Sequence, residues 1–270
     1  MSQQSKSHGR KSISANLQPR ALMTQSPQLA GVWTAQILTL FPEAFPGVLG
    51  ESLTGRALKD GKWALDTIDL RQFGEGNHRN VDDTPAGGGP GMVLKPNVAG
   101  AALDRALAQQ KTPLPMVCLS PRGTPFTQAR ARAWANAGGV TMLCGRFEGI
   151  DQRVIDHYQL EEISLGDFVL TGGEIAAQAM IDATVRLLPD ILGNEASIAE
   201  ESHMAGLLEH PHYTRPALWN GRSIPDVLQS GHHINIAKWR QEMSHQVTKE
   251  KRPDLWAAFQ NALGEKDPKG

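Results

Sequence analysis

The sequence has no long apolar run, only two cysteines and almost no net charge. Each of these shortages argues against a particular class of protein. Its longest apolar stretches have the length of strands, far short of the roughly 18 residues that a membrane span needs. Cys118 and Cys144 both lie within apolar segments, so we expect buried thiols in a reducing compartment rather than a redox or metal-binding pair. The net charge of −1 gives no indication of a polyanionic partner. We expect a soluble, cytoplasmic protein without membrane contact.

The first thirty residues differ in composition from the rest. They contain Lys6, Arg10, Lys11 and Arg20, no acidic residue, and many serines and glutamines. Such a segment cannot form a packed core and is predicted to be a disordered extension. A transit peptide shares this bias, but no clear amphipathic stripe accompanies it here. The whole chain of 270 residues, 40% of them hydrophobic, is long enough for one good core and a small second domain.

Strand and helix patterns alternate through the middle of the chain. Strands are predicted at residues 32–41, 62–70, 115–120, 140–144 and along the apolar run 163–170. Helices are predicted at residues 42–49, 51–59, 100–110, 127–137 and 174–188. This alternation indicates an α/β fold with a parallel sheet.

Two glycine-containing turns lie where predicted strands end. Gly145 to Gly149 follow the strand at 140–144, and Gly172-Gly173 follow the run at 163–170. Glycine lets the backbone approach a ligand closely because no Cβ stands in the way. Ligands in open α/β sheets usually bind at the carboxyl ends of strands. The two turns therefore predict a binding site.

Residues 71–91 form a long polar loop that contains the run Gly87-Gly88-Gly89-Pro90-Gly91. A loop of this length inside a compact domain is usually a functional lid or a disordered segment. Its glycines are suited to presenting amides to an anion, but the match to a phosphate-binding P-loop is poor. No Gly-Lys-Ser/Thr follows, and Pro90 lacks a donor. A mobile, turn-rich loop is the alternative interpretation.

The last third of the chain has a different character. Residues 193–202 are small and acidic, which is typical of a linker, and short helices are predicted at 225–228, 233–245 and 253–263. Basic residues outnumber acidic ones around the last two helices, with Trp239 among them. Such a surface either binds nucleic acid or, more commonly, is simply a solvated face.

Seven motifs in order resemble the bacterial tRNA (guanine-37) methyltransferase family: LFPEAF, VDDTPAGGGPGM, LSPRG, CGRFEGIDQRVI, GDFVLTGGE, HYTRP and SGHHINIAKWR. The resemblance runs from about Gly31 to Leu263. It implies methylation of ring nitrogen 1 of guanosine 37 in tRNA, next to the anticodon, with S-adenosylmethionine as donor and reading-frame maintenance as its role. It also implies an obligate homodimer whose active sites each use both subunits.

The fold implied by the resemblance is a SPOUT-type parallel sheet tied in a deep trefoil knot, which no periodicity could have indicated. A small all-α C-terminal domain follows. The expected organisation is an extension at 1–30, a methyltransferase domain at 31–192, a flexible acidic linker at 193–205 and a helical tRNA-binding domain at 206–270.

The cofactor pocket implied by the resemblance has three loops. They comprise Leu119, Ser120, Pro121 and Gly123; then Gly145, Arg146, Phe147, Glu148 and Gly149; then Ser164, Leu165, Gly166, Phe168, Leu170, Gly172 and Gly173. Backbone groups would bond the adenine edge while Leu165 and Leu170 pack on its faces. Glu148 would favour the cationic sulfonium, and an ordinary acid at a helix start is the less favoured alternative without the family.

Two further roles follow from the chemistry of the implied reaction. Nitrogen 1 of guanine carries a proton that a carboxylate must remove, and a cation should stabilise the charge that develops on the neighbouring oxygen. The resemblance assigns the base to Glu201 and the cation to Arg186. The family has an aspartate at the base position, so the acid here is one methylene longer. Glu200 is the competing candidate for the base.

The resemblance also implies how the tRNA is held. Asp82, Pro90 and Gly91 of the polar loop would contact the target guanosine, which an enzyme generally takes out of the stack. Residues 233–252, with Lys238 and Arg240, would contact the anticodon stem. Mg²⁺ is expected in the reaction, with unknown ligands.

Two other functions stay open on these residues. One is a ribose 2′-oxygen methyltransferase of the same superfamily, which Arg186 and the linker acid disfavour because they suit deprotonation of a base. The other is a catalytically silent RNA-binding module that keeps the fold and binds tRNA but no cofactor.

Overall fold

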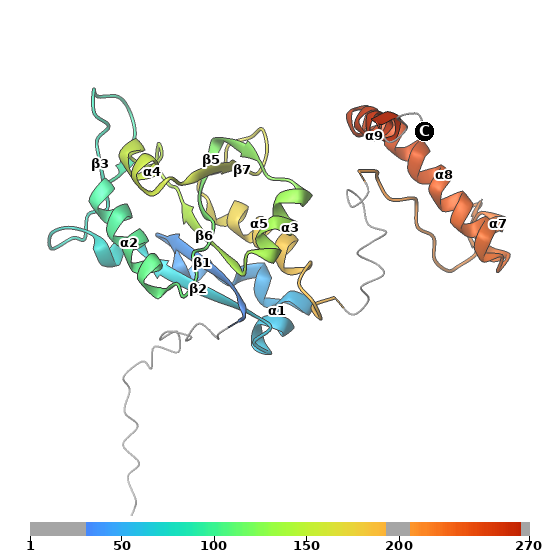
Figure 1. The fold of residues 1–270 in the computed structure, drawn as a ribbon, viewed down its shortest axis with the longest axis horizontal. Helices are drawn as coiled ribbons and strands as arrows, with labels where there is room; N and C mark the ends of the chain where they lie inside the picture. Colours follow the sequence, from blue (N-terminus) through green and yellow to red (C-terminus); the bar gives the residue numbers. More distant parts are fainter. Residues whose placement is uncertain (1–30, 193–205, 266–270) are drawn as a thin grey trace, which may run out of the picture.

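The computed structural model describes residues 31–192 and 206–265, and its centre is a five-stranded sheet with the order β2-β1-β6-β5-β7 (Figure 1). The strands are β1 (Trp33–Thr39), β2 (Trp63–Asp69), β5 (Met116–Pro125), β6 (Gly139–Cys144) and β7 (Glu161–Ser164). All neighbouring pairs run parallel. The α/β prediction with a parallel sheet is confirmed, and the trefoil knot stays a prediction.

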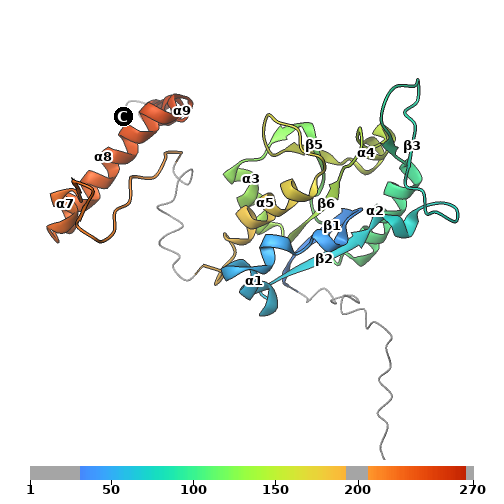
Figure 2. The ribbon, with the colours of Figure 1, turned by 180° about the vertical axis from the view of Figure 1, so that it is seen from behind.

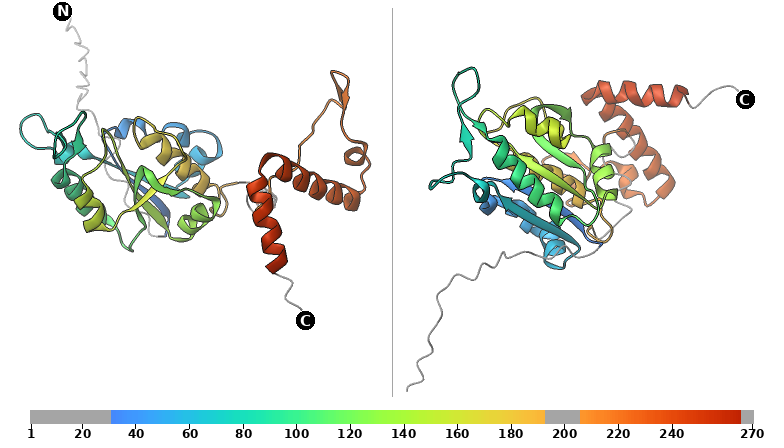
Figure 3. Two further views of the ribbon diagram at one scale, coloured as in Figure 1. Left: turned by 90° about the horizontal axis from the view of Figure 1, so that it is seen from above. Right: turned by 60° about the vertical axis from the view of Figure 1, so that its left-hand side comes forward.

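The sheet is covered by helices on both faces. Helices α1 (Ser52–Lys59), α3 (Gln128–Asn136) and α5 (Glu174–Val185) contribute to one apolar cluster, and α2 (Pro96–Gln109) and α4 (Gln152–Tyr158) to the other. The two layers are visible from behind in Figure 2 and from two further sides in Figure 3. Every residue of β1 and β6 is buried, as expected for central strands of a parallel sheet.

Among the elements whose bounds differ from the sequence-based predictions, three have a clear physical reason. The run at 163–170 is a strand only as far as Ser164, because the Ser164 hydroxyl accepts from the Gly166 N–H and turns the chain. Residues 42–49 form two 3₁₀ turns instead of one helix, since Pro46 lacks a donor and Gly47 has a φ of 54°. Helix α2 begins at Pro96, a residue suited to the first helical position.

The two cysteines are free and buried in adjacent strands, which confirms the prediction of buried thiols. Burial, with a smaller contribution from Glu162, raises the pKa of Cys118 to about 12. Burial, followed by Glu174, likewise raises the pKa of Cys144 well above its usual value. Both side chains therefore stay protonated at neutral pH. Among the helices that the structure describes, none is long and apolar enough to cross a membrane.

The C-terminal part contains α7 (Asp226–Gln229), α8 (His233–Lys251) and α9 (Pro253–Glu265). The rings of His245, Trp256 and Phe259 pack where α8 meets α9, with centroids 5.4–5.7 Å apart. This part is not entirely helical. Strands β8 (Leu218–Trp219) and β9 (Arg222–Ser223) form a hairpin around Asn220 and Gly221, which both have the positive φ that such a turn requires.

The predicted extension at 1–30 and linker at 193–205 lie outside the described residues, as do residues 266–270. The domain boundaries therefore stay predictions.

Candidate active site

A pocket of about 350 Å³ lies where β6 and β7 end and where a register shift between Leu119 and Thr124 interrupts the pairing of β5. Its volume falls within the range of small-ligand pockets. The walls come from three segments, residues 118–122, 145–150 and 162–173, with Ile155 and Ala176 added from α4 and α5. The two glycine turns singled out in the sequence thus face one cavity.

All the predicted cofactor residues except Gly123 and Gly166 line this pocket. A Cβ on Gly123 would come within 2.3 Å of the Glu162 carbonyl carbon, so this glycine serves the contact between β5 and β7. Gly166 belongs to the turn that ends β7, where its N–H donates to Ser164. The lining residues that sequence reasoning missed are Cys118, Arg122, Ile150, Ile155, Glu162, Ile163, Val169, Thr171 and Ala176.

Arg146, in the turn after β6, makes contacts with several segments. Its Nε and Nη2 lie 3.0 and 2.9 Å from Glu174 Oε2, and its Nη1 donates to the Thr171 carbonyl at 3.2 Å. The guanidinium carbon also lies 4.4 Å from the centroid of the Phe41 ring. On the far side, the Thr39 hydroxyl donates to Glu174 Oε1 at 2.7 Å. Arg146 is therefore held by the protein on one side of the pocket.

A second arginine lies on another wall. Arg122 donates to Glu162 Oε1 from Nε and Nη2, at 3.2 and 2.8 Å, and from Nη2 to Gln152 Oε1 at 3.3 Å. Its side chain is 64% exposed. An ion pair that faces solvent to this extent contributes little stability, so Arg122 remains adaptable to a ligand.

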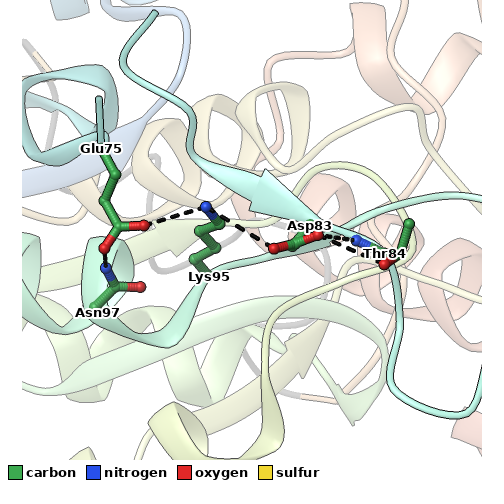
Figure 4. A network of polar contacts seen from close by, with 5 residues as sticks. All are labelled: Glu75, Asp83, Thr84, Lys95 and Asn97. Atoms are coloured by element: carbon green, nitrogen blue, oxygen red, sulfur yellow. Dashed lines mark hydrogen bonds and ion pairs between the residues drawn. The ribbon is translucent and has the colours of Figure 1, made fainter. Parts of the chain in front are cut away.

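The base of the polar loop is anchored by ion pairs and a short ladder. Strand β3 (Asp82–Asp83) pairs antiparallel with β4 (Val93–Leu94). Lys95 Nζ lies 3.2 Å from Glu75 Oε2 and 4.0 Å from Asp83 Oδ2. Asn97 donates to the other oxygen of Glu75, and Asp83 accepts from Thr84 (Figure 4). The loop between β3 and β4 therefore projects from a fixed base.

The same loop is joined to the pocket turn through backbone hydrogen bonds. The Glu148 N–H donates to the Met92 carbonyl at 2.9 Å, and the Leu94 N–H donates to the Gly149 carbonyl at 3.0 Å. A Cβ on Gly91 would come within 2.3 Å of Glu148 Cγ. The structure thus places Gly91, predicted to contact the target base, directly against Glu148, predicted to contact the cofactor.

The remaining loop residues predicted to contact the target base differ in setting. Asp82 is half-buried in β3, and Pro90 is exposed near the tip of the loop. Gly87, Gly88 and Gly89 have positive φ values, and a Cβ added to any of them would have no atom within 4 Å. These three glycines therefore permit turns and make no close approach.

The two predicted catalytic residues that the structure describes, Glu148 and Arg186, do not meet at this pocket within one chain. Arg186 is half-buried at the C-terminal end of α5. It follows Glu174 by twelve residues, which corresponds to roughly 18 Å along a helix axis. Glu201 and its competitor Glu200 lie outside the described residues. Of the predicted catalytic side chains that the structure describes, Glu148 lines the pocket and Arg186 does not.

Lys238 and Arg240, predicted to contact tRNA, are exposed on α8. Lys238 Nζ lies 3.8 Å from Glu242 Oε1, one turn further along the helix. Between them, Trp239 packs against Tyr213 and His210, with ring centroids 6.1 and 6.3 Å apart. Its aromatic ring therefore attaches α8 to the HYTRP segment, while the two cations face outward.

No group of three or more His, Cys, Asp or Glu side chains within residues 31–192 and 206–265 is arranged to hold a metal ion. The Mg²⁺ expected from the resemblance therefore has no ligands assigned among these residues.

Comparisons with known proteins agree with the resemblance. The model of the family described as tRNA (Guanine-1)-methyltransferase TrmD matches residues 33–258. The tRNA (guanine-N(1)-)-methyltransferase of Ruegeria sp. strain TM1040 is 63% identical over 238 residues, 88% of this chain and 98% of the relative. The enzyme of Cereibacter sphaeroides strain KD131 is 64% identical over 243 residues, which cover 89% of this chain and 97% of the relative. The enzyme of Brucella suis is 55% identical over 238 residues, which cover 88% of this chain and 96% of the relative. The chain therefore belongs to the tRNA (guanine-1)-methyltransferase family, and its parallel sheet is that of a SPOUT-type fold.

Proposed function

We propose that the protein transfers a methyl group from S-adenosylmethionine to ring nitrogen 1 of guanosine 37 in tRNA. The observation that carries the proposal is the contact between Gly91 of the polar loop and Glu148 of the pocket. In the proposal, a base held by the loop therefore lies beside a ligand held by the pocket. The printed names of the relatives, all tRNA (guanine-N(1)-)-methyltransferases, support the same reaction.

The pocket suits S-adenosylmethionine in its chemistry. Leu165, Leu170 and Ile163 give it apolar walls for a flat aromatic ring, and the glycine turns bring backbone donors and acceptors close. Glu148 adds a carboxylate in the wall, which favours a ligand that carries a positive charge. Gly172 and Gly173 line the pocket beside α5, and the space that side chains there would need is occupied by Arg146 and Cys144.

The bound cofactor supplies an electrophilic methyl group on a cationic sulfur. In the proposed mechanism, Glu201 removes the proton from nitrogen 1 of guanine and frees its electron pair for the new N–C bond, which forms as the bond between the methyl carbon and the sulfur breaks and leaves a neutral thioether. Arg186 stabilises the negative charge that develops on the adjacent oxygen. Glu148 would favour binding of the cationic cofactor through its negative charge. The polar loop, with Asp82, Pro90 and Gly91, holds the flipped base against the pocket.

We propose that the active site is completed by a second copy of the chain. Arg186 lies roughly 18 Å from the pocket end of α5 along the helix, too far to act there within one chain. The pocket rim and the first turn of α5 also expose large apolar side chains. Phe147, Phe168 and Val169 line the pocket, Ile175 belongs to α5, and all four are 47–81% exposed. A homodimer that covers this rim and supplies Arg186 from its other chain accounts for both observations.

The remaining parts of the proposal concern tRNA and the compartment. The exposed Lys238 and Arg240 on α8 are placed to contact phosphates of the anticodon stem. Mg²⁺ is proposed as a further requirement, without assigned ligands. Free thiols and a tRNA substrate fit a cytoplasmic enzyme.

Methyl transfer to an unmodified tRNA with guanosine at positions 36 and 37 tests the proposal, followed by nucleoside analysis. We expect 1-methylguanosine. A 2′-O-methylated nucleoside would instead identify a ribose methyltransferase. Absence of S-adenosylmethionine binding in calorimetry would identify a silent RNA-binding module.

Heterodimers test the shared site. A subunit with Arg186→Ala combined with a subunit with Glu201→Gln should recover part of the lost activity if the two roles come from opposite chains. Verified heterodimers without any recovery would contradict this part of the proposal.

A further inference from the structure

We propose that Glu174 is a positioning residue that sets the shape of the cofactor pocket. It does so by holding Arg146 between the two glycine turns of the pocket, one after β6 and one before α5. Glu174 does not line the pocket itself, whereas Arg146 does. The identity of the ligand rests on the proposed function, but the positioning role concerns the protein in the absence of any ligand.

The burial of Glu174 distinguishes it from an ordinary acid at a helix start. It is the first residue of α5, where the helix dipole favours a negative charge even at full exposure. Its exposed fraction is only 3%, and an ionised carboxylate at that depth is costly unless it is paired and hydrogen-bonded. Both oxygens are in fact bonded, one by the Thr39 hydroxyl and the other by Arg146.

Arg146 connects segments that are distant in the sequence. The planar guanidinium uses two nitrogens on Glu174 and a third on the Thr171 carbonyl, and it lies over the Phe41 ring. Such a forked arrangement fixes orientation as well as distance. The turn after β6, the turn before α5 and the segment after β1 are thereby tied to one side chain.

The glycines at the second turn leave room for this side chain. A Cβ on Gly172 would come within 2.1 Å of Arg146 Nε. The Gly173 N–H donates to the Gly145 carbonyl at 3.0 Å, and a Cβ there would lie 2.9 Å from Cys144 Cα. The two turns therefore touch, and Arg146 lies across their junction.

Loss of the Glu174 charge should release this junction. Arg146 would then face a neutral partner and exchange its contacts for water, and residues 166–173 would become mobile in the ligand-free protein. The cofactor would have to order them on binding, which weakens its affinity. RNA contacts on α8 and on the polar loop do not involve Glu174 and should be unaffected.

Glu174→Gln tests the proposal because amide and carboxylate have nearly the same shape. Calorimetry with S-adenosylmethionine alone should show an affinity about tenfold lower, within the range of coupling between side chains of one network. In the protein without ligand, amides of residues 166–173 should exchange hydrogen faster than in the wild type. At saturating cofactor, kcat should stay within a few-fold of the wild type.

Glu161→Gln is the matched control. It removes a carboxylate that pairs with Arg130 at 2.6 Å, at a site outside the pocket lining. Cofactor affinity and the exchange of residues 166–173 should both match the wild type. An equal loss of affinity in both variants would overturn the proposal, because it would then reflect a general effect of charge.

A double-mutant cycle shows whether Glu174 acts through Arg146. If it does, the variant carrying Glu174→Gln and Arg146→Met should bind the cofactor no more weakly than Arg146→Met alone. Losses that add would overturn the proposal. If Glu174→Gln fails to fold, hydrogen exchange is measured in Arg146→Met instead. Unchanged exchange of residues 166–173 in that variant would also overturn the proposal.

The tests separate this proposal from the proposed function. Failure of the wild type to methylate tRNA would contradict the function and leave the exchange result intact. Wild-type affinity and exchange in Glu174→Gln would contradict the positioning role even if tRNA is methylated.

Discussion

The two ends of helix α5 differ in how much of their surroundings one chain supplies. At the N-terminal end, Glu174 is buried and bonded, and the pocket lies next to it. At the C-terminal end, Arg186 is half-buried, and the chain continues to Pro189 and then toward the acidic segment that holds the predicted base. One end is built to hold a ligand, and the other carries residues that suit chemistry on a base.

From this difference we expect cofactor binding and base chemistry to be separable in this protein. The Arg146 network lies within one chain beside the pocket, so changes at the N-terminal end should act on cofactor affinity. Arg186 lies away from that pocket within one chain, and Glu201 is predicted to act on the base, so changes at the C-terminal end should act on turnover. Variants at the two ends of α5 test whether cofactor affinity and turnover depend on different residues.

The largest expected effect is on turnover in Glu201→Gln. Removal of a positioned base typically lowers the rate about 10²–10⁴-fold, whereas S-adenosylmethionine affinity should be unchanged. Glu200→Gln is the control and should stay within a few-fold of the wild type in single-turnover assays. Glu201→Asp, with the shorter arm, should recover much of the rate. An inactive Glu200→Gln variant together with an active Glu201→Gln variant would assign the role of the base to Glu200.

Arg186→Ala should lower turnover about 10²-fold, comparable to the loss of one donor to a developing oxyanion. Cofactor binding, measured by calorimetry, should be unchanged because Arg186 is proposed to act on the oxygen of the guanine and not on the cofactor. A parallel fall in cofactor affinity would break the division between the two ends.

Gly172→Ala should weaken S-adenosylmethionine binding by about tenfold, because its Cβ would displace Arg146 from the network. Gly88→Ala is the control: its φ of 80° strains an alanine locally, but no atom lies within 4 Å of the new methyl group, and the residue does not line the pocket. Titration calorimetry on both variants measures the difference. Equal affinities would show that the close approach at Gly172 has no bearing on the pocket.

The smallest expected effect is a change in how stability depends on pH, through Cys118 in the pocket lining. The pKa of Cys118 is raised from 9.0 to about 12 in the folded state, mainly by burial. Above pH 9 the unfolded chain therefore releases this proton before the folded protein does, and the free energy of unfolding falls as pH rises toward 12. For one thiol, the decline is roughly 1.4 kcal/mol per pH unit. Urea unfolding at pH 8 and 10 should show a smaller decline in Cys118→Ala than in the wild type.

Much of the sheet was predictable because most of its strands contain apolar runs or alternate apolar with polar residues, and because strands and helices follow one another regularly. The pocket turns were also predictable, since Gly145 and Gly172 directly follow such runs. The end of β7 was not, because it depends on a hydrogen bond from Gly166 to Ser164 that no hydrophobic pattern reveals. The β8–β9 hairpin was missed although Asn220-Gly221 is a strong turn signal, because strands of two residues have no periodicity.

The role of Glu174 was hidden for a different reason. In the sequence, Glu174 is an acidic residue at the start of a predicted helix, and the helix dipole alone is enough to explain an acid at that position. Its burial follows from Thr39 and Arg146, which lie 135 and 28 residues away and meet it only in the folded chain. Likewise, the spacing of Arg186 from the pocket is a property of an intact helix, whereas the motif alone suggested that the two belong to one site.

The burial of Cys118 and Cys144 also makes the protein convenient to label. These are the only two cysteines of the chain, so a thiol added on the surface would be the only one open to a maleimide dye. Ala86, exposed in the loop between β3 and β4, is a suitable position. A fluorophore on Ala86→Cys would test whether an RNA base enters beside Gly91, as proposed.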